Sequence, residues 1–404
     1  MNATETKYAV RFGSLIVEGW RFVPHSYAIV NMYQCLELMR YDGLRLFHRD
    51  LPFAFDHWRT AEGLIDAEAD EALRRIVSCP DQMADVCLRI GYPYDLRPAA
   101  KARRTYVMIT AEVRAVPVAD IAGGIPLAQA LSGNDTTIVT PSRWSREGII
   151  ASGAAPERVV VVPHGVDPTI YRPRSSGERA VLRQALKWEN HFVFLSVGAL
   201  KDKGLDELLA AFAVVHAQNP SARLVIKGLN ALYGSAIFQS AVDRVCKIHG
   251  EHIGQAVWYV GGALSAVKMA ALYQAADVYV SPYRAEGFNI PVLEAMACGL
   301  PIICTAGGAT EDFVTDDCCL RIRSQPVSAV CRQTMGTCLL PDQGHLAELM
   351  SQIMNDEAFL DRARLVAPWR AHHDFTWERV VGRLLDVLFT TTPGDRESDT
   401  VCGA

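Results

Sequence analysis

Long apolar runs and an excess of basic residues are both missing from this chain of 404 residues. Charged residues interrupt each apolar stretch before it reaches the roughly 18 residues that a membrane-spanning helix requires. The net charge of -5 is not that of a chain dominated by nucleic-acid binding, which needs a concentrated excess of Lys and Arg. We therefore expect no nucleic-acid partner and, at most, peripheral contact with a membrane.

Signals for secretion and for metal binding are also lacking. The opening residues, MNATETKYAVRFG, show no cationic segment followed by an apolar one, so no secretory signal is indicated. The eleven Cys residues form no CxxC pair, and even the cluster Cys318, Cys319, Cys331 and Cys338 favours packing over a zinc site. Most of the Cys residues lie in apolar segments, as buried reduced thiols do. These features predict a cytoplasmic protein without a metal site.

What the chain does contain is a regular alternation of short apolar runs with amphipathic helical stretches. The first series of runs is SLIVEG, LRLFHR, DVCLRI, TYVMITA, TTIVTP and VVVVP. After RPRSSGERAVLRQ, interpreted as a linker leading into a short helix, the second series is FVFLSVG, RLVIKG, AVWYVG, DVYVSP and PIICTA. Continuous apolar strands alternating with helices are typical of parallel sheets covered on both faces. The pattern predicts an α/β fold with two doubly wound, Rossmann-like domains facing a cleft.

Domain boundaries follow from where the two series begin and end. We place the first domain at residues 1–173 and the second at residues 174–374. The segment FTWERVVGRLLDVLF has the periodicity of an amphipathic helix, so residues 375–390 are expected to form a helix that crosses back to the first domain. The polar residues 391–404 are expected to be a disordered tail.

The most informative segment is DVYVSPYRAEGFNIPVLEAMACGLPII. A strand ends near Pro282, a Gly-containing loop follows, and Pro291 stands where a first helical turn would begin. Loop amides and a helix N-terminus suit a diphosphate, while a carboxylate can accept both hydroxyls of a ribose. We therefore assign Glu294 to the ribose, and Glu286 to the sugar or its departing oxygen. The alternative is an ordinary helix-start Glu and a solvated loop charge.

The same segment resembles a donor-binding element of known enzymes. EGFNIPVLEAMACGLPII is similar to the E-x7-E element of the retaining glycosyltransferases of family four, which have the GT-B fold. SVGALKDKGLDELLAAF, ALYQAADVYVSP and VTPSRWSREGIIASGAAPERVVVVPHGVDPTIYRP resemble other parts of these enzymes in the proper order. The resemblance implies that the amides of Gly287, Phe288 and Asn289 hold the phosphates. It also implies an acceptor-side first domain, a donor-binding second domain and a nucleoside-diphosphate sugar as co-substrate, without a cofactor.

One departure from the family pattern concerns the cations that neutralise the diphosphate. The family usually has an Arg soon after the Gly of the first donor-domain strand and a Lys a few residues later. This chain keeps Lys203 but has Ala199 and Leu200 where the Arg would fall. Leaving-group charge must still be met by cations and backbone dipoles. Lys227 or Lys201 could replace the Arg, although Lys227 is equally well explained as a solvated strand end.

Candidates in the first domain follow its strands. Glu112 comes just after TYVMITA and is expected at the cleft, where it would contact the sugar or orient the acceptor hydroxyl, unless it only caps the next turn. In EGWRFVPHS, Gly19 allows close backbone approach of a phosphate or acceptor, and Ser26 is expected to cap the next helix. His25 beside it is a weaker candidate for the same loop. For His164 we favour turn geometry beside Gly165 over catalysis.

These observations predict an enzyme of polysaccharide biosynthesis. We expect a metal-independent glycosyltransferase that moves a sugar from a nucleoside-diphosphate sugar to a glycan or lipid-linked acceptor, with retention implied by the resemblance. A sugar-nucleotide epimerase of the same fold and a non-catalytic sugar-nucleotide-binding module stay open as alternatives. A short basic run is expected to be either a solvated loop or a contact with the anionic inner face of a membrane; it comprises Arg97, Lys101, Arg103 and Arg104.

Overall fold

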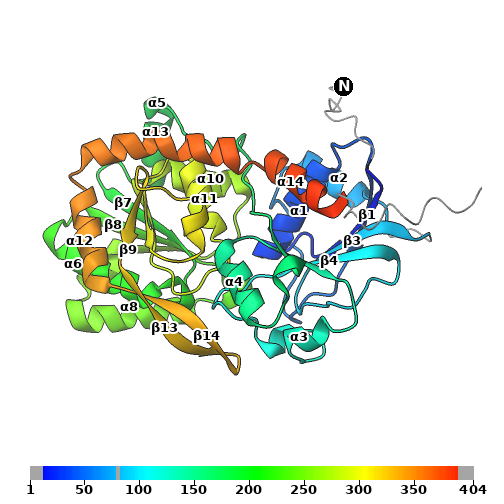
Figure 1. Ribbon diagram of the computed structural model, residues 1–404. Helices are drawn as coiled ribbons and strands as arrows, with labels where there is room; N and C mark the ends of the chain where they lie inside the picture. Colours follow the sequence, from blue (N-terminus) through cyan, green and yellow to red (C-terminus); the bar gives the residue numbers. More distant parts are fainter. Residues whose placement is uncertain (1–11, 79–81, 390–404) are drawn as a thin grey trace, which may run out of the picture.

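The computed structural model describes residues 12–78 and 82–389, which form two α/β domains side by side (Figure 1). Each domain is built on a parallel six-stranded sheet. The prediction of two doubly wound domains is thus confirmed. The tail predicted at residues 391–404 lies outside the described residues.

The first sheet has the strand order β2-β1-β3-β4-β5-β6, and all neighbouring strands are parallel. Strand β1 is buried along its whole length, as expected of an apolar strand covered on both faces. The strands are β1 (Ser14–Gly19), β2 (Arg45–Asp50), β3 (Ala84–Ile90), β4 (Ala102–Met108), β5 (Thr137–Thr140) and β6 (Val159–Val161). The α-helices of this domain are α1 (Ser26–Leu38), α2 (Ala67–Arg75), α3 (Leu127–Ala130) and α4 (Arg143–Ala151).

The second sheet has the order β12-β11-β10-β7-β8-β9, again with parallel neighbours. Its strands are β7 (Phe192–Val197), β8 (Ala222–Lys227), β9 (Val257–Val260), β10 (Val278–Ser281), β11 (Ile302–Thr305) and β12 (Cys319–Ile322). Its helices are α5 (Ser176–Leu186), α6 (Leu205–Gln218), α7 (Asn230–Tyr233), α8 (Ala236–His249), α9 (His252–Ala256), α10 (Ala266–Ala275), α11 (Ile290–Ala297), α12 (Gln343–Ile353) and α13 (Glu357–Asp374). The strand order reverses between β7 and β10, and such a switch point is where doubly wound sheets bind ligands.

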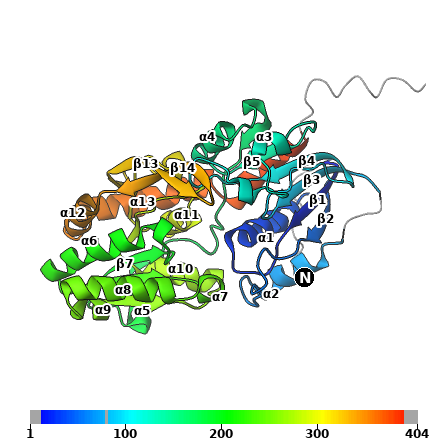
Figure 2. The same cartoon turned by 90° about the horizontal axis from the view of Figure 1, so that it is seen from below.

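Two elements from the later part of the chain reach the first domain. Helix α14 (Trp377–Phe389) continues from α13 and packs against α1 (Figure 1), where the rings of Trp377 and Tyr33 stack with their centroids 5.6 Å apart. The hairpin β13 (Ser324–Cys331) and β14 (Thr334–Pro341) lies beside the first domain near α4 (Figure 2). The amide of Thr337 donates to the carbonyl of Val113 at 2.6 Å, so the hairpin ties the two domains together.

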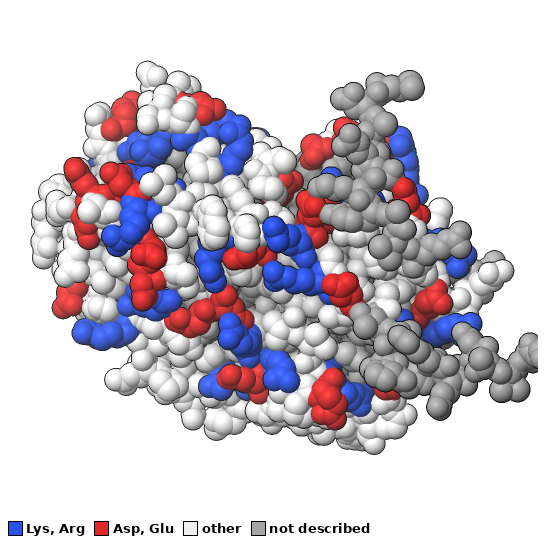
Figure 3. All heavy atoms as spheres, turned by 45° about the horizontal axis from the view of Figure 1, so that its top comes forward, with Lys and Arg blue, Asp and Glu red and all other residues white. Residues whose placement is uncertain are grey.

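The lengths of the helices and the distribution of surface charge are relevant to the predicted peripheral contact with a membrane. None of the helices in residues 12–78 and 82–389 is long and apolar enough to cross a membrane. On the face shown in Figure 3, basic and acidic side chains are interspersed. In the basic run, Arg97 pairs with Asp95 at 2.8 Å and Arg103 lies 3.9 Å from Asp85, so part of its charge is already compensated.

Candidate functional site

A cavity of about 590 Å³ lies between the two domains and is lined by residues of both. Among the loops that line it are those that follow the strands flanking the switch point of each sheet. In the first domain these loops carry His25 after β1 and Tyr92 after β3; in the second they carry Lys203 after β7 and Glu286 after β10. The topology therefore brings together side chains that are far apart in sequence at the place where a ligand is expected.

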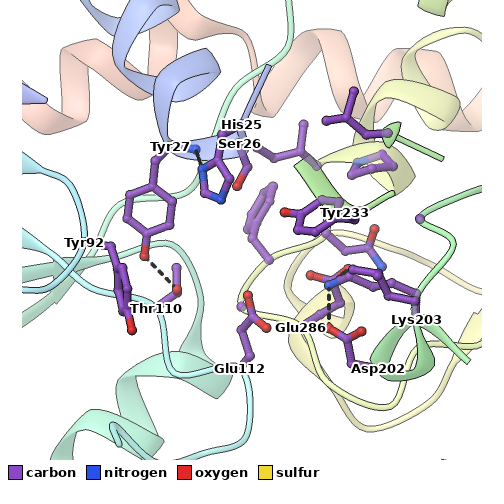
Figure 4. Close-up of a pocket in the computed structure, with 18 of the residues that line it drawn as sticks. His25, Ser26, Tyr27, Tyr92, Thr110, Glu112, Asp202, Lys203, Tyr233 and Glu286 are labelled. Carbon is purple, nitrogen blue, oxygen red and sulfur yellow. Dashed lines mark hydrogen bonds and ion pairs between the residues drawn. The ribbon is translucent and has the colours of Figure 1, made fainter. Parts of the chain in front are cut away.

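Lys203 and Glu286 form an ion pair on the second-domain side of the cavity (Figure 4), with 2.9 Å between Nζ and Oε1. Burial disfavours the charged amine, but the carboxylates of Glu286, Glu112 and Asp202 hold the pKa of Lys203 well above its usual range. Burial raises the pKa of Glu286 to about 7, against the opposing effect of Lys203. The lysine is therefore a permanent cation at neutral pH, and the glutamate titrates near neutrality.

The loop after Glu286 forms a tight turn that enters α11. Asn289 caps the helix with a φ of 77°, and its side-chain amide donates to the hydroxyl of Ser281 at 3.0 Å, which fixes the turn. The backbone amides of Gly287, Phe288 and Asn289 donate to no other group within the described part of the chain. Free amides at a helix N-terminus favour an anion. The ring of Phe288 instead packs into the second-domain core, so this residue offers its backbone alone.

The first domain holds this turn from the other side. The hydroxyls of Ser142 and Ser145 donate to the carbonyl of Gly287 at 2.6 and 3.2 Å. A Cβ at Gly287 would lie only 2.8 Å from the Cβ of Thr110, so the approach of the two domains requires glycine here. The predicted anion site is thus part of the domain interface. Sequence reasoning did not identify the two serines.

The structure separates the two lysines proposed to replace the missing Arg. Lys227 lines the cavity and is 5% exposed, whereas Lys201 is exposed and is not among the lining residues. The alternative interpretation of Lys227 as a solvated residue at a strand end is therefore wrong. Its amine donates to the carbonyl of Gly228, and burial lowers its pKa to about 8. Ala199 and Leu200 line the same wall and supply no charge.

Glu112 and His25 lie on the first-domain side of the cavity (Figure 4). Glu112 is exposed and is directed toward the side that carries Glu286. His25, and not Ser26 as predicted, caps α1: its Nδ1 accepts the amide of Tyr27 at 3.3 Å. Burial lowers the pKa of His25 to about 4, so its imidazole is neutral and carries its proton on Nε2.

Gly19 is not among the residues that line the cavity. A Cβ at this position would lie 2.8 Å from both the side-chain amide of Asn31 and the carbonyl of Ile90. The backbone at Gly19 does approach other groups closely, as predicted, but these groups belong to the protein itself. The proposed phosphate or acceptor contact of Gly19 has no support in this geometry.

Glu294 does not line the cavity either. The hydroxyl of Tyr273 donates to its carboxylate at 2.8 Å, and burial raises its pKa to about 7 against the opposing hydrogen bonds of Tyr273 and Tyr171. The predicted contact with a ribose is not apparent in this geometry, because Glu294 lies outside the lining of the cavity. That role stays a prediction.

His164 lies closer to the site than expected. It lines the cavity, and its ring centroid is 5.1 Å from that of Phe288. Burial lowers its pKa to about 3, which rules out a cationic role. Gly165 beside it does not have a positive φ; a Cβ there would instead come within 2.8 Å of Trp377. Turn geometry is therefore the wrong explanation, and the glycine is needed for packing.

Sequence reasoning also missed a group of hydroxyls on the first-domain wall. Tyr27 shares hydrogen bonds with Tyr94 at 2.7 Å and with Thr110 at 2.9 Å (Figure 4). In addition, Arg332 reaches the cavity from the turn of the β13–β14 hairpin. These residues come from four separate segments, and although Tyr27 and Thr110 fall in segments predicted as a helix and a strand, no motif singled out any of the four.

Comparisons with known proteins show what this chain is similar to. Residues 178–321 match the family model described as "Glycosyl transferases group 1". The chain is 30% identical over 294 residues to D-inositol 3-phosphate glycosyltransferase 1 of Catenulispora acidiphila, covering 72% of this chain and 64% of that protein. It is 27% identical over 238 residues to a GDP-mannose-dependent phosphatidylinositol monomannoside mannosyltransferase of Corynebacterium glutamicum, covering 56% and 55%. The chain spans 35–64% of the length of the first curated relatives it matches.

Solved structures share the fold over nearly the whole chain. Anabaena HepE in complex with UDP-glucose gives a TM-score of 0.68 at 15% identity, covering 94% of this chain and 100% of that one. WaaG, a glycosyltransferase involved in lipopolysaccharide biosynthesis, gives a TM-score of 0.63 at 15% identity with the same coverage. These likenesses confirm the predicted GT-B architecture.

Proposed function

This chain belongs to the group 1 glycosyl transferases, and on that premise we propose that it transfers a sugar from a nucleoside-diphosphate sugar to a hydroxyl of a glycan or lipid-linked acceptor. The observation that carries the proposal is the convergence of Lys203, Lys227 and the free amides of residues 287–289 on one cavity. Two cations and a helix N-terminus are what a departing diphosphate requires. A sugar nucleotide is also the ligand of HepE.

The proposed chemistry needs no metal ion, because protein groups meet the negative charge that develops on the leaving diphosphate. Lys203 is charged at neutral pH and sits beside Glu286, so the phosphates would share the amine with this carboxylate. Lys227 adds a second cation from the end of β8. Donors fixed in place before the reaction cost little reorganisation when charge develops.

We assign the two glutamates that line the cavity to the sugar and the acceptor. Glu286 is on the donor side and would contact the transferred sugar. Glu112 faces it from the first domain and would contact the sugar or orient the acceptor hydroxyl. Retention at the anomeric carbon is proposed from the resemblance to family four. The ribose role of Glu294 is not included, since this residue does not line the cavity.

The remaining part of the proposal concerns a lipid-linked acceptor and contact with a membrane. A lipid-linked acceptor would bring the protein to a membrane surface, where the basic run near Arg97 would meet anionic lipid. Because Arg97 and Arg103 already have carboxylate partners, we expect that attraction to be weak.

The test begins with thermal unfolding of the chain against a panel of UDP-, GDP- and dTDP-sugars. A ligand at 100 times its Kd stabilises the protein by about 2.7 kcal/mol, which identifies the donor. Product analysis with that donor then separates the alternatives. A glycosylated product supports the proposal, an isomerised donor indicates an epimerase, and binding without either product indicates a binding module.

A further inference from the structure

The first-domain wall of the cavity has no cationic side chain of its own. Among the described residues that line it from residues 12–120, none is Lys or Arg, and the carboxylates of Glu112 and Asp120 are the charged groups. The first-domain wall is this set of lining residues, which begins at Trp20 and ends at Asp120. A phosphate or carboxylate placed against it would face negative charge.

The cation that reaches this wall from the second domain is already engaged. Arg332, from the hairpin, donates to the carboxylate of Asp120 and to the hydroxyl of Tyr92, the latter at 2.6 Å. Its guanidinium carbon also lies 5.2 Å from the centre of the Tyr92 ring. His25 does not add a charge, because it is neutral. An anionic ligand here would have to break the Arg332–Asp120 pair and leave a carboxylate without its cation.

What the wall offers instead is rings and hydroxyls. Phe55 is 47% exposed, and across the cavity Tyr233 is also 47% exposed. The hydroxyls of Tyr27 and Thr110 belong to the same lining and are hydrogen-bonded to each other (Figure 4), and the Nε2–H of His25 is a neutral donor. Rings that cover the apolar face of a ligand, with a few fixed polar groups for its hydroxyls, suit an uncharged sugar.

We infer that the acceptor unit that enters this wall is an uncharged sugar, with no phosphate or carboxylate on the ring that receives the transferred glycosyl group. The inference rests on the proposed function and names the substrate class of its acceptor side. It separates this chain from a relative named for D-inositol 3-phosphate, since a ring phosphate would need cations that the first-domain wall does not supply. Charge more distant in the acceptor, beyond the cavity, is outside the inference.

The experiment compares acceptors in matched pairs, using the donor selected by thermal unfolding and nucleotide release as the rate assay. The pairs are glucose and glucose 6-phosphate, mannose and mannose 6-phosphate, myo-inositol and inositol 3-phosphate, and methyl glucoside and methyl glucuronide. We expect the neutral member of the most active pair to have a kcat/KM at least about tenfold higher, because one like charge in a partly buried site costs this much. An anionic member that is equal or better in that pair overturns the inference.

A variant distinguishes charge from fit. Ser26 is exposed and lines the cavity at the start of α1, so Ser26→Lys places a cation on the wall and Ser26→Gln adds length without charge. We expect Ser26→Lys, and not Ser26→Gln, to raise the relative rate with the anionic member of each pair about fivefold or more. The same change in both variants would contradict the charge argument. Absence of sugar-nucleotide binding to the unaltered protein would defeat the proposed function itself.

Discussion

The buried amine of Lys227 makes donor binding depend on pH in a range where phosphates no longer titrate. The side chain is 5% exposed, and loss of hydration lowers its pKa to about 8. In the free protein at pH 9, only about one tenth of the molecules would carry this charge. A bound diphosphate requires the charged form, so the apparent Kd for a nucleoside diphosphate should rise about tenfold between pH 7 and pH 9.

Isothermal titration calorimetry at constant ionic strength measures this directly. The titrant is the nucleoside diphosphate whose sugar conjugate gives the largest thermal shift. Lys227→Met should bind more weakly at pH 7 and should lack the loss of affinity that centres on pH 8, so any remaining change is the one near pH 7 from Glu286. Lys201→Met is the matched control, because Lys201 is exposed and does not line the cavity, and it should keep the unaltered pH dependence. A Kd that is constant within about twofold from pH 7 to pH 9 in the unaltered protein would refute the reasoning.

Three further predictions follow from the same cavity. Lys203→Ala should lower turnover on the order of 10²-fold, as loss of an oxyanion donor does, and near-normal turnover in steady-state kinetics would remove its role. Gly287→Ala should lower kcat/KM on the order of 10²-fold, because its Cβ would lie 2.8 Å from that of Thr110 and displace the turn. Gly262→Ala, where a Cβ meets nothing within 4 Å, is the control, and equal rates in the two variants would contradict the argument. Arg332→Gln should lower the free energy of unfolding by no more than about 1 kcal/mol, because its ion pair is partly exposed; a larger loss in denaturant unfolding would show that the hairpin is a major stabilising contact.

The fold could be predicted because its signal is local. Eleven apolar runs coincide with strands of the two sheets, since strands buried on both faces need continuous apolar sequence. The strand β12 was missed: it is four residues long and follows the polar stretch DFVTDDC. The hairpin β13–β14 was missed because part of its packing surface is in the other domain, at Val113 and Asp120, more than 200 residues earlier.

The candidate site could be predicted only in part, because some of its residues belong to local motifs and others are brought together only by the fold. Glu286 and Lys203 belong to compact motifs, and their place at the switch point follows from strand order. The choice of Lys227 over Lys201 depends on which side chain is buried at the end of β8, which spacing does not reveal. The partner of Glu294 is a tyrosine 21 residues earlier on another helix, and no motif links the two.

A crystal structure with the selected nucleoside diphosphate bound would test the central claim most directly. The account predicts that the phosphates lie within hydrogen-bonding distance of the Lys203 amine and of the amides of residues 287–289, with Lys227 facing them in the cavity. A diphosphate bound elsewhere, or a turn at residues 286–289 closed off from the nucleotide by the protein, would contradict it.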